Sequence, residues 1–139
     1  MLQRDARLAL AEDLLGRCET LYDIGSNHGF LAVHMLLTGR CRRAVLCDIS
    51  ANALSRARGL VARAGLADRA AFAVTDGFAG LDPQPGDAAA ILGMGGRTIA
   101  AILREGLPCP VVLQANVEIA CARRRVEQAG MHIAREGVA

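Results

Sequence analysis

Three features of the sequence predict an α/β fold, in which a mostly parallel sheet carries helices on both faces. Short apolar segments alternate with amphipathic ones along the chain. The apolar segments are apolar throughout rather than at every second residue, which is typical of parallel strands buried on both faces. The length of 139 residues suits a single domain, 1–139. Ligands of open parallel sheets bind beyond the carboxyl ends of the strands, so we expect the loops there to hold the functional residues.

The first element is an amphipathic helix over residues 4–17, in which Leu8, Ala11, Leu14 and Leu15 recur at helical spacing. Four elements follow in order: a strand over 21–25, a helix over 29–37, a strand over 43–48 and a helix over 51–64. The chain offers Ser50 as the N-cap of the last of these helices and Gly65 as its C-terminal stop.

The alternation continues in the second half of the chain, where an Asp-Gly turn at 76–77 follows the next strand. We expect a strand over 70–75, a strand over 87–92, a helix over about 97–105, a strand over 110–114, a helix over 117–129 and a sixth strand over 131–135. The loops at 25–29, 48–50, 76–78, 93–96 and 114–117 should therefore line one crevice.

Composition excludes several classes of protein. The 53% hydrophobic content argues against a disordered chain, and no apolar run reaches the roughly 20 residues that span a bilayer. The net charge of +2 and the 3% aromatic content do not by themselves indicate a nucleic-acid-binding protein. The five cysteines form no C-x-x-C pair, and the three histidines lie at no metal-ligand spacing, so no metal site is expected. Without a secretory signal at its start, the chain is expected in the cytoplasm, away from membranes.

The loop after the first strand combines a tight turn with an acid. Gly25 allows the turn and Gly29 opens a helix, but Asn27 stands where the dinucleotide motif G-x-G-x-x-G has its second glycine. Asp23 precedes the first glycine by two residues. A carboxylate there repels a phosphate and suits a cationic ligand such as an amino-acid ammonium group.

Two more acids follow the next two strands. Asp48 lies 23 residues after Gly25, near the spacing of an acid that binds ribose hydroxyls, although a helix-capping role is the plainer alternative. Asp76 could accept a hydrogen bond from an adenine amino group, or the Asp-Gly pair could be only a turn. Together the acids favour S-adenosyl-L-methionine over NAD, because nothing cradles a pyrophosphate.

These segments resemble the bacterial tRNA (adenine(22)-N(1))-methyltransferase family. Residues 23–31 (DIGSNHGFL) resemble its DIGSDHAYL signature, 76–78 its GDGL segment, 91–96 (ILGMGG) its IAGMGG and 113–116 (LQAN) its LQPN. Arg7 and Leu8 match an early R-L pair, and order and spacing agree from about residue 4 to Glu136.

The resemblance implies a Rossmann-like class I methyltransferase fold, S-adenosyl-L-methionine as the methyl donor, and N1 of an adenine in tRNA as the acceptor. It gives the cofactor seven residues: Asp23 and Gly25 at the methionine end, Asp48 with Ile49 at the ribose, Asp76 with Gly77 at the adenine, and Gly93. The target base would be bordered by Met94, Gly95, Gly96, Gln114 and Asn116.

Adenine N1 already carries a lone pair, so the protein has to align the base and stabilise developing positive charge rather than remove a proton. The catalytic candidates are Asn27, which stands where the family usually has Asp, and His28, which is equally suited to a local bond at a helix start.

The chain ends at Ala139, whereas the family continues through further strands and a C-terminal helical domain that helps to hold tRNA. We therefore expect tRNA binding to be weak and sensitive to salt. An uncovered apolar edge at 111–113 would favour a homodimer. Three hypotheses remain: an active tRNA methyltransferase, a non-catalytic cofactor-binding relative or fragment, and a class I methyltransferase acting on a small molecule or protein. A nicotinamide-dependent enzyme is a distant fourth.

Overall fold

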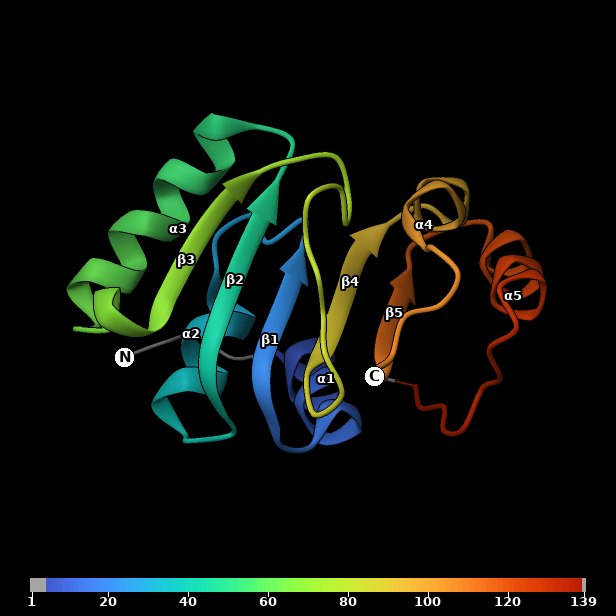
Figure 1. Ribbon diagram of the computed structural model, residues 1–139, viewed down its shortest axis with the longest axis horizontal. Helices are drawn as coiled ribbons and strands as arrows, with labels where there is room; N and C mark the ends of the chain where they lie inside the picture. Colours follow the sequence, from blue (N-terminus) through green and yellow to red (C-terminus); the bar gives the residue numbers. More distant parts are fainter. Residues whose placement is uncertain (1–4, 139) are drawn as a thin grey trace.

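A single five-stranded parallel sheet forms the centre of the molecule (Figure 1). The computed structural model describes residues 5–138. The strands are β1 (Cys18–Ile24), β2 (Cys41–Asp48), β3 (Ala70–Val74), β4 (Ala88–Met94) and β5 (Val111–Ala115). They lie in the order β3-β2-β1-β4-β5, and every neighbouring pair is parallel. The predicted parallel α/β sheet is confirmed.

Helices cover both faces of this sheet, as predicted. They are α1 (Ala6–Leu15), α2 (Phe30–Leu37), α3 (Ala51–Arg63), α4 (Gly96–Ile102) and α5 (Ile119–Gln128), with a short 3₁₀ turn, η1 (Ala67–Arg69). The first three helices pack into one hydrophobic cluster, and the last two into a second cluster on the opposite face. Ser50 caps α3 as predicted, because its Oγ accepts a hydrogen bond from the Ala53 N–H.

Side chains of each strand alternate between the two clusters. In β2, Leu46 belongs to the cluster under α1, α2 and α3, and the next residue, Cys47, belongs to the cluster under α4 and α5. In β4, Ala90 and Ile91 divide in the same way. Both faces need apolar residues, which explains why these segments are apolar at consecutive positions.

One buried polar pair joins the first two helices. The Glu12 side chain of α1 is fully buried and contacts Nδ1 of His34 on α2. A buried carboxylate needs such a partner, because desolvation of an unpaired charge is costly. Within the described residues, no helix has the length and apolar character required to cross a bilayer.

The predicted sixth strand over 131–135 is wrong. These residues form no regular element, and residues 132–138 are exposed. The segment lies beside α5 and α1 instead of β5: Glu136 pairs with Arg123 of α5, and Gly137 lies against the Leu10 side chain. A strand needs a paired neighbour to satisfy its backbone, and this path provides none. Residue 4, the predicted start of the first helix, lies outside the described residues.

Candidate functional site

A crevice of about 340 Å³ opens at the carboxyl ends of the strands. It lies where the strand order reverses, since β2 and β3 lie on one side of β1 and β4 and β5 on the other. Crevices at this point of an open sheet are the usual ligand sites. Its lining residues are Ile24, Gly25, Asn27, Cys47, Asp48, Ile49, Thr75, Asp76, Gly77, Leu92, Gly93, Met94, Thr98, Ala101 and Ile102.

The loop after β1 is held tightly against β2. The N–H groups of Gly25 and Ser26 both donate to the Cys47 carbonyl, each at 2.9 Å. Gly25 has a φ of 72°, and a Cβ at this position would collide with the Met94 methyl group. The left-handed φ favours glycine at this turn, as the sequence predicted.

Asp48, the last residue of β2, accepts hydrogen bonds from two neighbouring segments. Its Oδ1 accepts a hydrogen bond from the Ser50 N–H at 3.0 Å, and its Oδ2 accepts one from the Asn27 N–H at 3.4 Å. The carboxylate thus joins the loop after β1 to the start of α3, while it still lines the crevice. Beside it, Ile49 is 74% exposed and offers an apolar wall.

Asp23 lies beneath the crevice rather than in its lining. Its side chain is buried, with 4% of its surface exposed. Burial, and secondarily the charge of Asp48, raises the pKa of the Asp23 carboxyl to about 7. At neutral pH this group is therefore divided between its neutral and charged forms, so a nearby cation would favour ionisation.

The third strand end contributes Asp76 and Gly77 as predicted, and both line the crevice. The position of Gly77 is crowded, because a Cβ there would lie 3.1 Å from Cγ2 of Ile102. Ile102 and Thr98 of α4 complete this wall. The sequence does not point to these two residues, since nothing in a helix pattern shows which strand end the helix will face.

The fourth and fifth strand ends are joined by a hydrogen-bonded bridge. The Gly93 N–H donates to Oε1 of Gln114 at 2.8 Å, and Nε2 of Gln114 donates to Oδ1 of Asn116 at 2.9 Å. The Asn116 N–H in turn donates to the Met94 carbonyl at 2.8 Å. Gln114 and Asn116 therefore shape the crevice margin without belonging to its lining.

The glycines of this segment differ in their surroundings. Gly93 has a φ of 74° and open space where a Cβ would stand, so it leaves room for a ligand. Gly96 is buried, and a Cβ there would collide with the Glu118 carbonyl. Close packing of α4 against the segment before α5 accounts for Gly96, and its contact with a substrate stays a prediction.

The predicted catalytic pair is divided by the fold. Asn27 lines the crevice and adopts a left-handed φ of 53°, which asparagine tolerates better than most residues. His28, the next residue, lies in a separate groove and stacks on Phe30 with a ring-centroid distance of 5.3 Å. A direct role of His28 at the target base stays a prediction.

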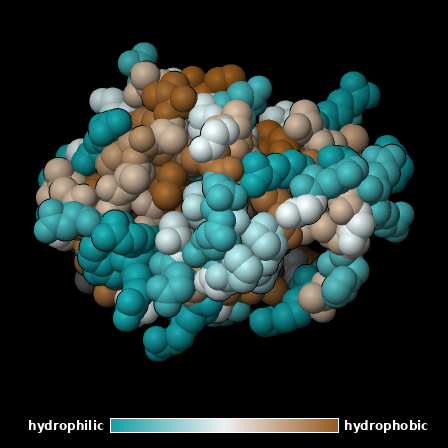
Figure 2. Space-filling view, in the orientation of Figure 1, coloured by the Kyte–Doolittle hydropathy of each residue, from teal (hydrophilic) through white to brown (hydrophobic). Residues whose placement is uncertain are grey.

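The crevice suits the predicted cofactor in both size and charge. Its lining holds two carboxylates and no arginine, which favours a cationic ligand with hydroxyl and amino donors over a pyrophosphate. Its volume falls within the range of small-molecule sites. Figure 2 shows apolar side chains along the upper margin of the molecule, over the carboxyl ends of the strands, where a purine ring would find an apolar surface. Across residues 5–138, no three His, Cys, Asp or Glu side chains are grouped so that they could hold a metal ion.

Comparisons with known proteins agree with this geometry. A family model described as a methyltransferase domain matches residues 4–139. The tRNA (adenine(22)-N(1))-methyltransferase of Bacillus subtilis is 29% identical over 105 residues, which cover 76% of this chain and 44% of that protein.

Solved structures show the same fold. The B. subtilis m1A22 tRNA methyltransferase TrmK matches with a TM-score of 0.83 and 26% identity, over 92% of this chain and 57% of that one. TrmK of M. capricolum, in complex with S-adenosyl-homocysteine, matches with a TM-score of 0.79 and 23% identity, over 88% of this chain and 57% of that one. The chain thus spans about half the length of these proteins.

Proposed function

We propose that this chain, which belongs to the methyltransferase domain family, transfers a methyl group from S-adenosyl-L-methionine to N1 of an adenine in tRNA. One observation carries the cofactor assignment: acids line the crevice after β2 and β3, a third acid is buried beneath it near the end of β1, and no arginine lines it. The acceptor assignment rests on the B. subtilis relatives, which are named as methyltransferases of tRNA adenine 22.

The crevice residues have distinct roles in this proposal. Asp48 would accept hydrogen bonds from the ribose hydroxyls, because its carboxylate is held in place by two backbone N–H groups. Asp76 would receive the adenine amino group, with Ile49 against the ring. The buried Asp23 would favour the ammonium end of the methionine moiety by ionising in its presence. When bound, the cofactor supplies an electrophilic methyl group carried on a sulfonium.

The residues near the acceptor have to orient a base rather than deprotonate it. With the cofactor bound, the lone pair of adenine N1 would take up the methyl group directly, and the base would acquire the positive charge that the sulfonium loses. The Asn27 amide at the crevice wall can accept a hydrogen bond from the exocyclic amine of the adenine. The bridge through Gln114 holds Gly93, Met94 and Asn116 in place at the side where the base would enter.

Two linked measurements test this proposal. Calorimetric titration with S-adenosyl-homocysteine should show binding, and Asp48→Asn should weaken it by about tenfold or more, because a hydrogen bond to a charged group is lost. Asp68→Asn is a matched control, since Asp68 is an exposed acid of η1 outside the crevice. The second measurement incubates the protein with labelled cofactor and a tRNA transcript that carries adenine 22, or guanine at the same position.

The outcomes separate the three hypotheses. Methylated adenine in the first transcript alone supports the proposal, and mass spectrometry of the nucleosides locates the methyl group. Tight cofactor binding with no transfer to tRNA, small molecules or protein identifies a non-catalytic relative. Transfer to an acceptor other than RNA identifies a different methyltransferase. Absence of cofactor binding contradicts the proposal at its first step.

We also propose a domain organisation for the chain and a place in the cell where it acts. Residues 1–139 would form one cofactor-binding domain, because the described residues build a single sheet with two hydrophobic clusters. A tRNA acceptor would place the reaction in the cytoplasm.

A further inference from the structure

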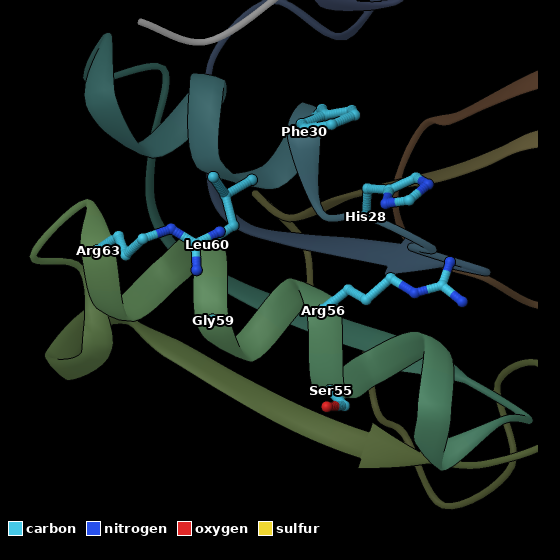
Figure 3. A pocket seen from close by; sticks show the side chains of 7 residues that line it. All are labelled: His28, Phe30, Ser55, Arg56, Gly59, Leu60 and Arg63. Carbon is cyan, nitrogen blue, oxygen red and sulfur yellow. The ribbon is translucent and has the colours of Figure 1, made fainter.

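A second hollow, with a volume of about 370 Å³, lies beside the crevice, between the start of α2 and one face of α3. Its lining residues are His28, Phe30, Ser55, Arg56, Gly59, Leu60 and Arg63, and we name it the α2–α3 groove (Figure 3). The groove and the crevice share one boundary, because Asn27 lines the crevice and the next residue, His28, lines the groove. Two consecutive residues of the loop after β1 thus face two different hollows.

The two hollows have opposite electrostatic character. The crevice is lined by Asp48 and Asp76 and by no arginine, whereas the groove is lined by Arg56 and Arg63 and by no acid. Both arginines are exposed, and neither forms an ion pair within residues 5–138, although several other arginines of the chain do. A cationic cofactor suits the first hollow and an anionic ligand the second.

The helix pattern of α3 places the two arginines on one stripe. Arg56 and Arg63 are seven residues apart, which is close to two helical turns and a rise of about 10 Å. Gly59 and Leu60 lie between them on the same stripe. Glycine at position 59 leaves room for the Arg63 guanidinium, because a Cβ there would lie 3.1 Å from Nη1 of Arg63.

An aromatic pair forms the opposite side of the groove. The rings of His28 and Phe30 stack with an interplanar angle of 16°, and Phe30 is 38% exposed although it is a large apolar residue. Figure 3 shows the Arg56 side chain extending along the groove below His28, while Ser55 points away from the other side chains. An exposed ring beside two guanidinium groups offers a stacking surface and phosphate contacts together.

We infer that the α2–α3 groove binds a segment of the tRNA acceptor, with phosphates on Arg56 and Arg63 and a base against the His28–Phe30 stack. This inference rests on the proposed function, which makes RNA the acceptor. Unstacking of the target adenine costs free energy that contacts elsewhere on the RNA must offset. The groove supplies such contacts next to the crevice, within the part of the chain that the structure describes.

The test measures binding of a tRNA transcript with adenine 22 by the whole chain, at several salt concentrations. The variant Arg56→Ala/Arg63→Ala should raise the Kd by about tenfold or more and lower the slope of log Kd against log salt by about 2, one for each lost phosphate contact. Arg56→Lys/Arg63→Lys should recover part of the affinity. Phe30→Leu, which keeps an apolar side chain without the ring, should raise the Kd by about tenfold.

The matched control is Arg43→Ala/Arg124→Ala, which removes the same charge from exposed positions of β2 and α5 and should change the Kd less than the groove variant. Binding of S-adenosyl-homocysteine should be equal in all variants and shows that each is folded. If the chain binds tRNA but the groove and control variants weaken binding equally, or not at all, the groove inference is wrong and the proposed function stands. If the unaltered chain binds the cofactor but no tRNA, the proposed acceptor fails and the inference fails with it.

Discussion

The side-chain oxygen of Gln114, near the end of β5, accepts a hydrogen bond from the backbone N–H of Gly93, near the end of β4, at 2.8 Å. Through its Nε2, the same amide also holds Asn116. Two neighbouring strand ends are thus joined by one side chain at the margin of the crevice. The bridge keeps Gly93 in its left-handed conformation, in which the site of a missing Cβ stays open.

We expect Gln114→Ala to lower the rate of methyl transfer by about tenfold and the free energy of unfolding by about 1 kcal/mol, because the Gly93 N–H loses its acceptor. The loop then samples conformations that misalign base and cofactor. Single-turnover assays and urea denaturation measure the two effects. Gln128→Ala, at the exposed end of α5, is the control. Equal rates of methyl transfer for both variants would show that Gln114 does not help to align the base and the cofactor.

We expect Asn27→Asp to raise the rate of methyl transfer, since a carboxylate at the crevice wall would stabilise the positive charge that the base acquires. The nearby Asp48 carboxylate raises the pKa of the new acid, so the gain should grow as pH rises through that pKa. Steady-state kinetics at several pH values provide the measurement. The control is Asn52→Asp, which makes the same change at an exposed position of α3. Unchanged or lower turnover would refute a charge-stabilising role at position 27.

The Asp23 carboxyl makes stability depend on pH. Burial raises its pKa to about 7 in the folded chain, whereas the unfolded chain keeps the ordinary value. Between these values the folded state binds the additional proton, so the free energy of unfolding should decrease by about 1–4 kcal/mol as pH rises from about 4 to about 7. Asp23→Asn should remove this decrease in urea denaturation, and Asp13→Asn, at an exposed position of α1, should retain it. A profile that is the same for Asp23→Asn and the unaltered chain would contradict this assignment.

The outer edge of β5 should promote self-association. Within residues 5–138, β5 pairs only with β4, and its residues, Val111–Ala115, are all half-buried. Unpaired strand edges tend to pair with other chains. Sedimentation velocity over rising protein concentration should therefore show a monomer–dimer equilibrium. A single monomeric species up to millimolar concentration would show that α5 and the segment after it protect the edge.

Much of the fold could be predicted because its signals are local. The apolar strands, the Ser50 cap and the Gly25 turn each depend on neighbours within a few residues, and the structure confirms all three. The strand predicted over 131–135 failed because a strand depends on a distant partner. Met131 and Ile133 suggest a strand locally, but the chain path carries them along α5 and away from β5.

For the site, the order of residues along the chain was enough to predict which ones follow the strands, and hence that Gly25, Asp48, Asp76 and Gly93 meet in one crevice. How each of these residues is held and surrounded depends on the packing of the folded chain. Strand register and helix packing are long-range, so no local pattern shows that Asp23 is buried beneath the crevice or that Gln114 anchors Gly93. The same packing sets Phe30 of α2 opposite Arg56 and Arg63 of α3, and thereby forms the cationic groove beside the acidic crevice.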